Sequence, residues 1–315
     1  MRSQDISDLM ILAALWGSSF LFIRISVGEF GPFPLMATRV VLAMAVLLPL
    51  VLWRHRLPVI IRFWRPIVMV GIFNAAIPFS LLAYAALTLP VGVLSIMNAS
   101  TPLWGGLITW LWLKESLPRL RVLGLVVGFV GIVLLVWEEL DLDSAFQSSL
   151  ALFASLLAAV SYGFSASYTR RHLMGASASA VACGCLLCAS VVLTPLAWLT
   201  WPLGPVSTTS WSGVIMLGLV CTGLSHVLFY RLVMNVGPAK ASTVSLLIPV
   251  FGVFWGWMWL GEDLEADMLV GCGIVLLGTA FATGLIGAKG LVGKRLFSRL
   301  RRKSDHAARS TGTNQ

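Results

Sequence analysis

Small polar side chains occur at matching positions in two apolar stretches of the sequence, 147 residues apart. In the first stretch they are Ser95 and Asn98, and Pro102 follows one turn later. The matching residues of the second stretch are Ser242, Ser245 and Pro249. Positions i, i+3 and i+7 lie on one face of a helix, so each polar pair points in the same direction as its proline. Interrupted apolar helices at matching places in two halves of a chain indicate a transporter's binding site.

The side chain of Asn98 limits where its helix can lie. An amide without a partner in hydrocarbon costs several kcal/mol, so Asn98 is expected to face protein or water. Pro102 and Pro249 each free a backbone carbonyl one turn earlier, and that carbonyl could contact a ligand. The alternative is that these groups only hold helices together or kink them, because Ser and Asn commonly join membrane helices. The duplication on one face favours a solute pathway, and both explanations stay open.

Arg39 lies about two turns into the second apolar segment. A central arginine costs about 2.5–3.5 kcal/mol on membrane-insertion scales, and less if it reaches the interface. Because Arg39 is expected near the outer face, the sequence favours snorkelling or an ion pair with Glu29. Contact with the carboxylate of a bound solute is the alternative.

His226 is the only histidine within a predicted membrane segment. Its imidazole could relay protons near neutral pH, or it could form a structural hydrogen bond. No predicted segment carries an Asp or Glu away from its ends, so obligatory proton coupling is not expected. Trp104, next to the first proline, is a candidate for facing an apolar solute. Further polar candidates for the pathway are Asn74, Tyr84, Tyr162 and Tyr230.

The composition is that of a polytopic membrane protein. Of the 315 residues, 58% are hydrophobic and 11% are charged, and the mean hydropathy is +0.91. About a quarter of the residues of a soluble domain are charged. A spanning helix needs about 20 mostly apolar residues. The segments that meet this requirement are 9–27, 33–53, 66–87, 91–113, 119–137, 149–169, 177–200, 211–234, 239–260 and 268–287.

Lys and Arg residues set the expected orientation. With the N-terminus in the cytoplasm, 20 of the 22 basic residues fall on the cytoplasmic side, and the opposite connectors hold only acidic charges. The other two, Arg24 and Arg39, lie within or at the edge of spans. We therefore expect ten helices in the plasma membrane (the inner membrane of a bacterium), with both termini cytoplasmic.

The net charge of +9 does not indicate nucleic-acid binding, because its main source is the basic tail, residues 288–315. That tail either lies on anionic lipid headgroups or stays disordered and reinforces the topology. Neither a metal nor another cofactor is expected, because no His or carboxylate lies near the cysteines to complete a site. The cysteines, all in apolar segments, are Cys183, Cys185, Cys188, Cys221 and Cys272.

Internal similarity divides the chain into two five-helix halves, residues 1–137 and 149–287, joined by an acidic extracytoplasmic linker at 138–148. Five crossings are an odd number, so the second half enters the membrane from the opposite side. The expected fold is therefore an all-α membrane protein made of two inverted repeats. Such repeats let a central pocket open alternately to each side.

The same residues carry a resemblance to a known family. They are the Trp-Gly-Ser-Ser-Phe run that begins at Trp16, Arg39 early in the second segment, and a Pro, Trp-Leu, Glu, Gly, Gly series in both halves. In this order and duplication, the chain resembles the drug/metabolite transporter superfamily, in its ten-helix EamA-type family, over residues 9–287. The resemblance implies export or exchange of small metabolites, often amino acids, through a cavity between the repeats. Two departures are Lys114, where a small residue is usual, and the lack of a second-half arginine matching Arg39.

The expected function is that of a secondary transporter or facilitator that exports a small amphipathic, amino acid-like metabolite. A non-transporting sensor or assembly factor is the alternative, because a fold alone does not establish transport. A membrane-embedded enzyme is less favoured, since the spans offer one His, no acids and no nucleophile motif. The expected partners are the solute and the lipid bilayer, and both a monomer and a homodimer remain open.

Overall fold

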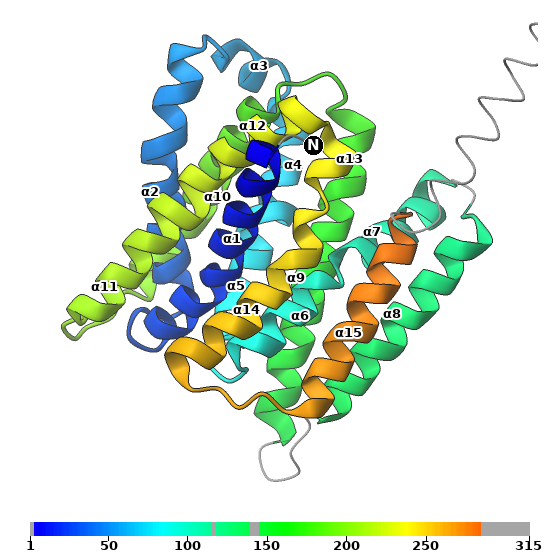
Figure 1. The fold of residues 1–315 in the computed structure, drawn as a ribbon. Coiled ribbons are helices and arrows are strands. Elements are labelled where there is room, and N and C mark those ends of the chain that lie inside the picture. The colour runs from blue at the N-terminus through cyan, green and yellow to red at the C-terminus, as the bar shows by residue number, and fades with distance from the viewer. Residues whose placement is uncertain (1–2, 115–116, 139–144, 285–315) are drawn as a thin grey trace, which may run out of the picture.

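Helices form nearly all of the computed structural model, which describes residues 3–114, 117–138 and 145–284 and has no strand in these ranges (Figure 1). The first half contains α1 (Ser3–Phe30), α2 (Pro32–Trp53), α3 (Leu57–Arg62), α4 (Trp64–Gly71), η1 (Ile72–Ala76), α5 (Ile77–Ala85), α6 (Val91–Ala99), α7 (Thr101–Leu113) and α8 (Arg119–Glu138). The second contains α9 (Ala145–His172), α10 (Ala178–Leu199), α11 (Thr208–Ile215), η2 (Met216–Leu224), α12 (Ser225–Val236), α13 (Pro238–Ala241), α14 (Val244–Leu260) and α15 (Ala266–Ala282).

Each of the ten predicted segments overlaps one helix or one interrupted helix. Eight helical stretches are long and apolar enough to cross a membrane, and α14 and α15 are shorter apolar helices at the ninth and tenth predicted positions. The basic tail at 288–315, Glu115 and residues 139–144 of the acidic linker lie outside the described residues. We call the side where α1 begins the N-terminal face; α3 and α13 lie on it, at the top of Figure 1.

Two of the helical crossings contain a π-helical stretch. η1 follows α4 and precedes α5, and η2 lies between α11 and α12. A π-helix bonds i to i+5 and widens the turn, and such stretches are frequent at functional sites. In η2 the Thr222 hydroxyl donates to Leu217 O, five residues earlier, at 2.7 Å.

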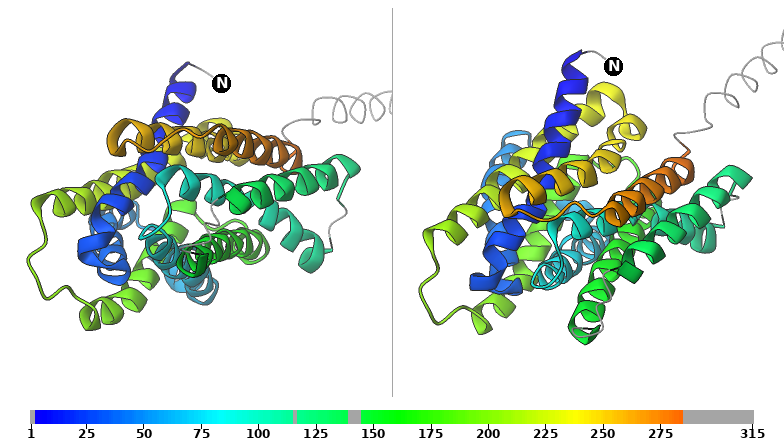
Figure 2. Two further views of the ribbon diagram at one scale, coloured as in Figure 1. Left: turned by 90° about the horizontal axis from the view of Figure 1, so that it is seen from below. Right: turned by 60° about the horizontal axis from the view of Figure 1, so that its bottom comes forward.

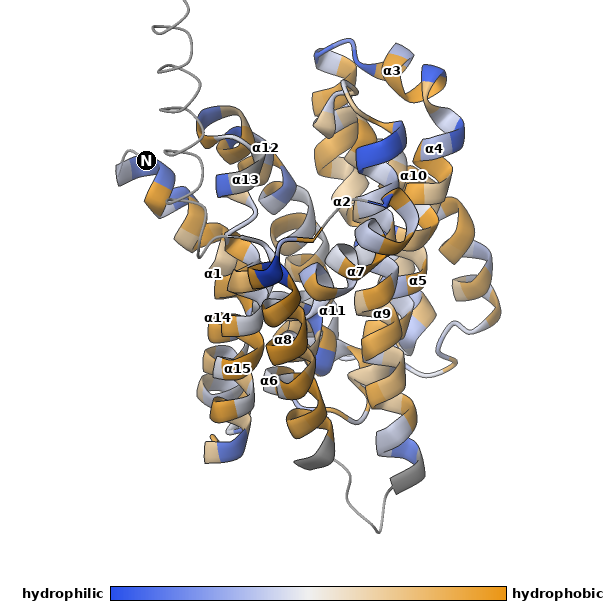
Figure 3. Ribbon diagram, turned by 90° about the vertical axis from the view of Figure 1, so that its right-hand side faces the viewer, coloured by the Kyte–Doolittle hydropathy of each residue, from blue (hydrophilic) through white to orange (hydrophobic). Residues whose placement is uncertain are grey.

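The helices of the two halves pack against one another. The α1–α14 contact has a counterpart in the α9–α7 contact, and α2 against η2 has a counterpart in α10 against η1. α8 and α15 form a pair at one end of the bundle, with α11 at the other end (Figure 2). Figure 3 shows that both helices of this pair are mostly hydrophobic along their lengths, as expected of helices that face lipid.

Glycines let α8 and α15 approach closely. A Cβ placed on Gly278 would collide with the backbone at Gly128 and would lie 2.8 Å from Gly124 O. Small residues at such contacts are the usual basis of helix association in membranes.

We expect the Gly278→Ala change to destabilise the protein by about 1–3 kcal/mol, because the added methyl group must force the two backbones apart. The measurement is the midpoint of thermal unfolding in detergent. Gly273→Ala is the matched control, since it lies on the same helix with nothing within 4 Å of its added methyl group. Equal midpoints for the two variants would contradict the close α8–α15 contact.

Candidate functional site

Arg39 on α2 is buried, with 7% of its surface exposed. Its Nε donates to Thr222 Oγ1 at 2.9 Å, and its guanidinium carbon lies 3.9 Å from the ring centroid of Phe79. In the described chain no carboxylate lies within 4.0 Å of this guanidinium. Its Nη1 also lies 3.8 Å from Met36 Sδ, so the group is a buried cation held by a hydroxyl, an aromatic ring and a thioether, with further hydrogen-bond donors left over.

The expected snorkelling of Arg39, or its pairing with Glu29, is wrong. Glu29 instead accepts from Ser207 N at 2.6 Å and from Ser207 Oγ at 2.8 Å, at the start of α11. Arg39 points into the bundle because α2 packs against η2, which brings Thr222 beside it.

Polar groups of α1 and α12 connect to Thr222, the hydrogen-bond partner of Arg39. His226 Nδ1 lies 2.6 Å from Thr222 O, and Trp16 Nε1 donates to Ser225 Oγ at 2.9 Å. The Trp16 and His226 rings meet edge to face with centroids 6.1 Å apart. Tyr162 on α9 is half-buried and packs against the main hydrophobic core. Two candidates that the sequence indicated separately, Arg39 and His226, therefore meet at Thr222.

A second polar group lies where α6 gives way to α7. Asn98 Oδ1, Thr101 Oγ1 and Trp104 Nε1 are buried and have no hydrogen-bond partner in the part of the chain that the structure describes. They recur every three residues across the break at Ser100, with Pro102 at the start of α7. A buried polar atom without a partner is costly, so these groups can hydrogen-bond a polar solute.

The duplicated serines Ser95 and Ser245 each bond to a backbone carbonyl three residues earlier. Ser95 Oγ donates to Gly92 O at 2.7 Å, and its side chain fills the space above Gly252 on α14. Ser245 Oγ donates to Ser242 O at 2.7 Å. Ser95 thus takes part in packing between α6 and α14, which the sequence left open as the alternative.

The remaining candidates are dispersed. Asn74 is half-buried in η1, Pro249 is buried in α14, and Tyr84 is 41% exposed at the end of α5. Tyr230 lies one turn after His226, with ring centroids 6.2 Å apart. Thr222 and Phe79 complete the Arg39 cluster and were not indicated by the sequence. The position of Thr222 one turn before His226 is the signal that could have found it.

Comparison with known proteins identifies the family of this chain. The model of the EamA-like transporter family matches residues 7–137 and again residues 149–284. The chain belongs to the EamA-like transporter family. This confirms the resemblance to the drug/metabolite transporter superfamily, and a multi-pass position in the plasma membrane agrees with it.

Relatives of the family are similar over most of the chain. PecM of Dickeya dadantii is 28% identical over 218 residues, which are 68% of this chain and 72% of that protein. The transporter YoaV of Bacillus subtilis is 21% identical over 86% of this chain and 93% of its own length. The inner membrane transporter YedA of Escherichia coli is 25% identical over 87% of this chain and 89% of its own. One solved crystal structure matches with a TM-score of 0.64 and 22% identity, covering 91% of this chain and all of that one, which shows the fold. Membrane transport is thus the function of the family to which this chain belongs.

Proposed function

We propose that this protein moves a small amphipathic, amino acid-like metabolite across the membrane, in the export direction, and that Arg39 binds its carboxylate. The observation that carries the proposal is the buried guanidinium without a carboxylate partner in the described chain. Ionisable residues inside membrane proteins mark substrate pathways by default. A planar guanidinium matches a carboxylate with two parallel hydrogen bonds.

The acceptor atoms near the α6–α7 break fit the other end of such a solute. Asn98 Oδ1 and Thr101 Oγ1 can accept hydrogen bonds from an ammonium group, and Trp104 supplies an aromatic surface and one N–H. The backbone of Gly163 on α9 packs against Trp104, which holds the indole at the α6–α7 break. We propose that one solute contacts both Arg39 and the polar atoms at this break.

Alternating access between two inverted repeats supplies the mechanism that we propose. Three observations support this proposal. One family model matches each half of the chain, and each half contains a π-helical stretch. Each of the contacts α1–α14 and α2–η2 also has an equivalent between the corresponding helices, α9–α7 and α10–η1. Near-equivalent packings of two such halves let a central site face each side in turn. We propose the two repeats at 1–137 and 149–287, with both termini in the cytoplasm.

Solute flux in proteoliposomes of the purified protein tests this function. We expect saturable uptake of zwitterionic amino acids, and much slower uptake of their amides, which lack the carboxylate. An imposed pH gradient distinguishes proton-coupled transport from facilitated diffusion, because only a proton-coupled carrier uses it to accumulate the solute against the solute's own concentration gradient. Equilibration without accumulation would assign His226 a structural role. Absence of flux for every amino acid would contradict the proposal and favour the sensor or assembly reading.

A further inference from the structure

A pocket of about 330 Å³ opens on the N-terminal face between α2, α10 and α12. Its polar side chains are Arg54, Ser179, Tyr230, Arg231 and Asn235. Apolar side chains line the rest: Leu50, Val227 and Met234. A lining with two arginines, an asparagine, a tyrosine and a serine beside apolar side chains suits a molecule with a negative end and an apolar end.

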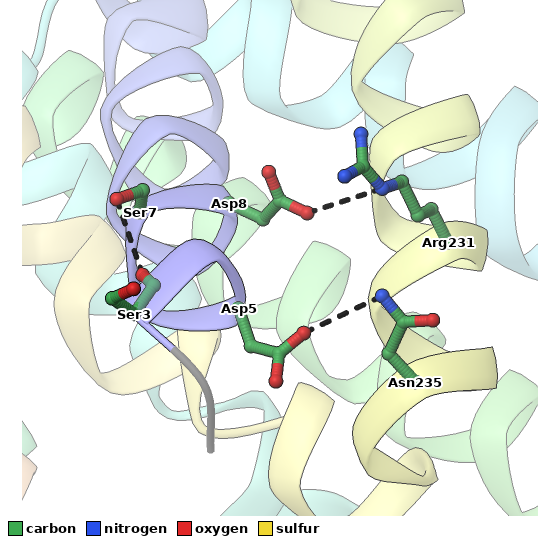
Figure 4. Close-up of polar contacts among 6 residues, drawn as sticks. All are labelled: Ser3, Asp5, Ser7, Asp8, Arg231 and Asn235. Atoms are coloured by element: carbon green, nitrogen blue, oxygen red, sulfur yellow. Dashed lines mark hydrogen bonds and ion pairs between the residues drawn. The ribbon is translucent and has the colours of Figure 1, made fainter.

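The two arginines keep donors available for a ligand. Arg231 shares one contact with Asp8 on α1, with Nε at 3.4 Å from Oδ2, and its side chain is 58% exposed (Figure 4). One turn further, Asn235 Nδ2 donates to Asp5 Oδ1 at 3.4 Å. Arg54 is exposed at the end of α2, and in the described chain no acidic side chain lies within 4.0 Å of it.

A polar stripe connects this pocket with Arg39. Tyr230, in the pocket wall, is followed at four-residue intervals towards the membrane interior by His226 and Thr222. The Tyr230 and His226 rings are 6.2 Å apart, His226 bonds Thr222 O, and Thr222 Oγ1 bonds Arg39. One face of α12 and η2 thus leads from two exposed guanidinium groups to the buried one.

We propose that this pocket is a second binding site for the solute, a vestibule on the N-terminal face where Arg54 and Arg231 bind its carboxylate before transfer to Arg39. The proposal rests on the proposed function, and it deepens that function by assigning an entry route and a preference for anionic over cationic solutes. Asp8 holds Arg231 in place at the rim, while the exposed part of its guanidinium meets the carboxylate.

The charge of the pocket can be measured without transport. In a Cys188→Ala background, Met234→Cys places a thiol in the pocket wall, where Met234 is 85% exposed. The rates of its modification by a negatively charged sulfonatoethyl methanethiosulfonate and by the positively charged trimethylammonioethyl reagent are compared. We expect the ratio of the two rates to favour the anion and to fall about fivefold with each of R54Q and R231Q. R119Q, which removes a basic side chain at the start of α8 that does not line the pocket, is the matched control and leaves the ratio unchanged.

Protection of the thiol identifies the ligand. L-Phenylalanine is expected to slow modification, phenylalaninamide is not, and R54Q abolishes the protection while leaving the Asp8–Arg231 contact intact. A ratio unaffected by both arginine variants would overturn the site. Protection by phosphatidylglycerol but not by the amino acid would overturn the vestibule and make the pocket a lipid headgroup site. Because the modification rates do not depend on flux, they test the charge of the pocket even if the flux assay excludes amino acids as solutes.

Discussion

Arg39→Gln is expected to lower kcat/KM for uptake of carboxylate-bearing solutes by at least about 25-fold. Losing one partner of a buried charge pair costs about 2–5 kcal/mol, and each 1.4 kcal/mol is a factor of ten. The measurement is the initial rate of uptake in proteoliposomes across a range of solute concentrations. Arg39→Lys should retain a small part of the activity, because an ammonium keeps the charge but cannot make two parallel bonds.

The same substitution should not destabilise the empty protein. Arg39 has no carboxylate partner in the described chain, so replacing it removes an uncompensated buried charge, and the unfolding midpoint in detergent should rise or stay the same. Arg24→Gln is the opposite control: Arg24 donates to Ala86 O at 2.6 Å and to Leu87 O at 2.8 Å, tying α1 to the end of α5, so its loss should lower the midpoint. Normal uptake by the Arg39→Gln protein would make Arg39 a structural residue.

The positions of the membrane helices were predictable because they depend on local composition. A run of about 20 apolar residues has few alternatives to a spanning helix, and all ten predicted segments overlap helical structure. The breaks in these helices were only partly predictable. Pro102 indicated the one after Ala99, whereas no residue pattern indicated the π-helical stretches η1 and η2.

The surroundings of single polar residues were not predictable from spacing. Helical periodicity places Ser95 and Asn98 on one face, but it does not say whether that face meets a helix or a solute. In the structure Ser95 meets Gly252, whereas Asn98 Oδ1 has no partner in the described chain. The environment of Arg39 depends on Thr222, 183 residues later in the sequence, which only the packing of α2 on η2 brings close.

Glu262 shows the same limit, since the sequence indicated that it belongs to an acidic connector and to the series repeated in both halves, but not what it contacts. Its carboxylate accepts from Val91 N at 2.7 Å and from Gly92 N at 3.1 Å, the first two N–H groups of α6. Gly256 leaves room for it, because a side chain there would collide with the carboxylate. A carboxylate at a helix N-terminus is stabilised by free N–H groups and by the helix dipole. This contact joins α14 to α6, and so the two halves, on the face opposite the N-terminal one.

Glu262→Gln is therefore expected to loosen the two halves at this face. Losing the charge while keeping one acceptor should cost about 1–2 kcal/mol, which changes the ratio of joined to separated states about 5- to 30-fold. Spin labels at Thr88→Cys and Leu260→Cys, both exposed, report the separation of α6 from α14 as a distance distribution. We expect a longer, broader distribution for Glu262→Gln, and none of this change for Asp263→Asn, which removes the same charge from the neighbouring exposed residue. In the alternating cycle proposed above, separation at this face is one half of the cycle, so the Glu262→Gln protein should also show an altered maximal rate of flux. An unchanged distance distribution would mean that Glu262 caps α6 without holding the halves together.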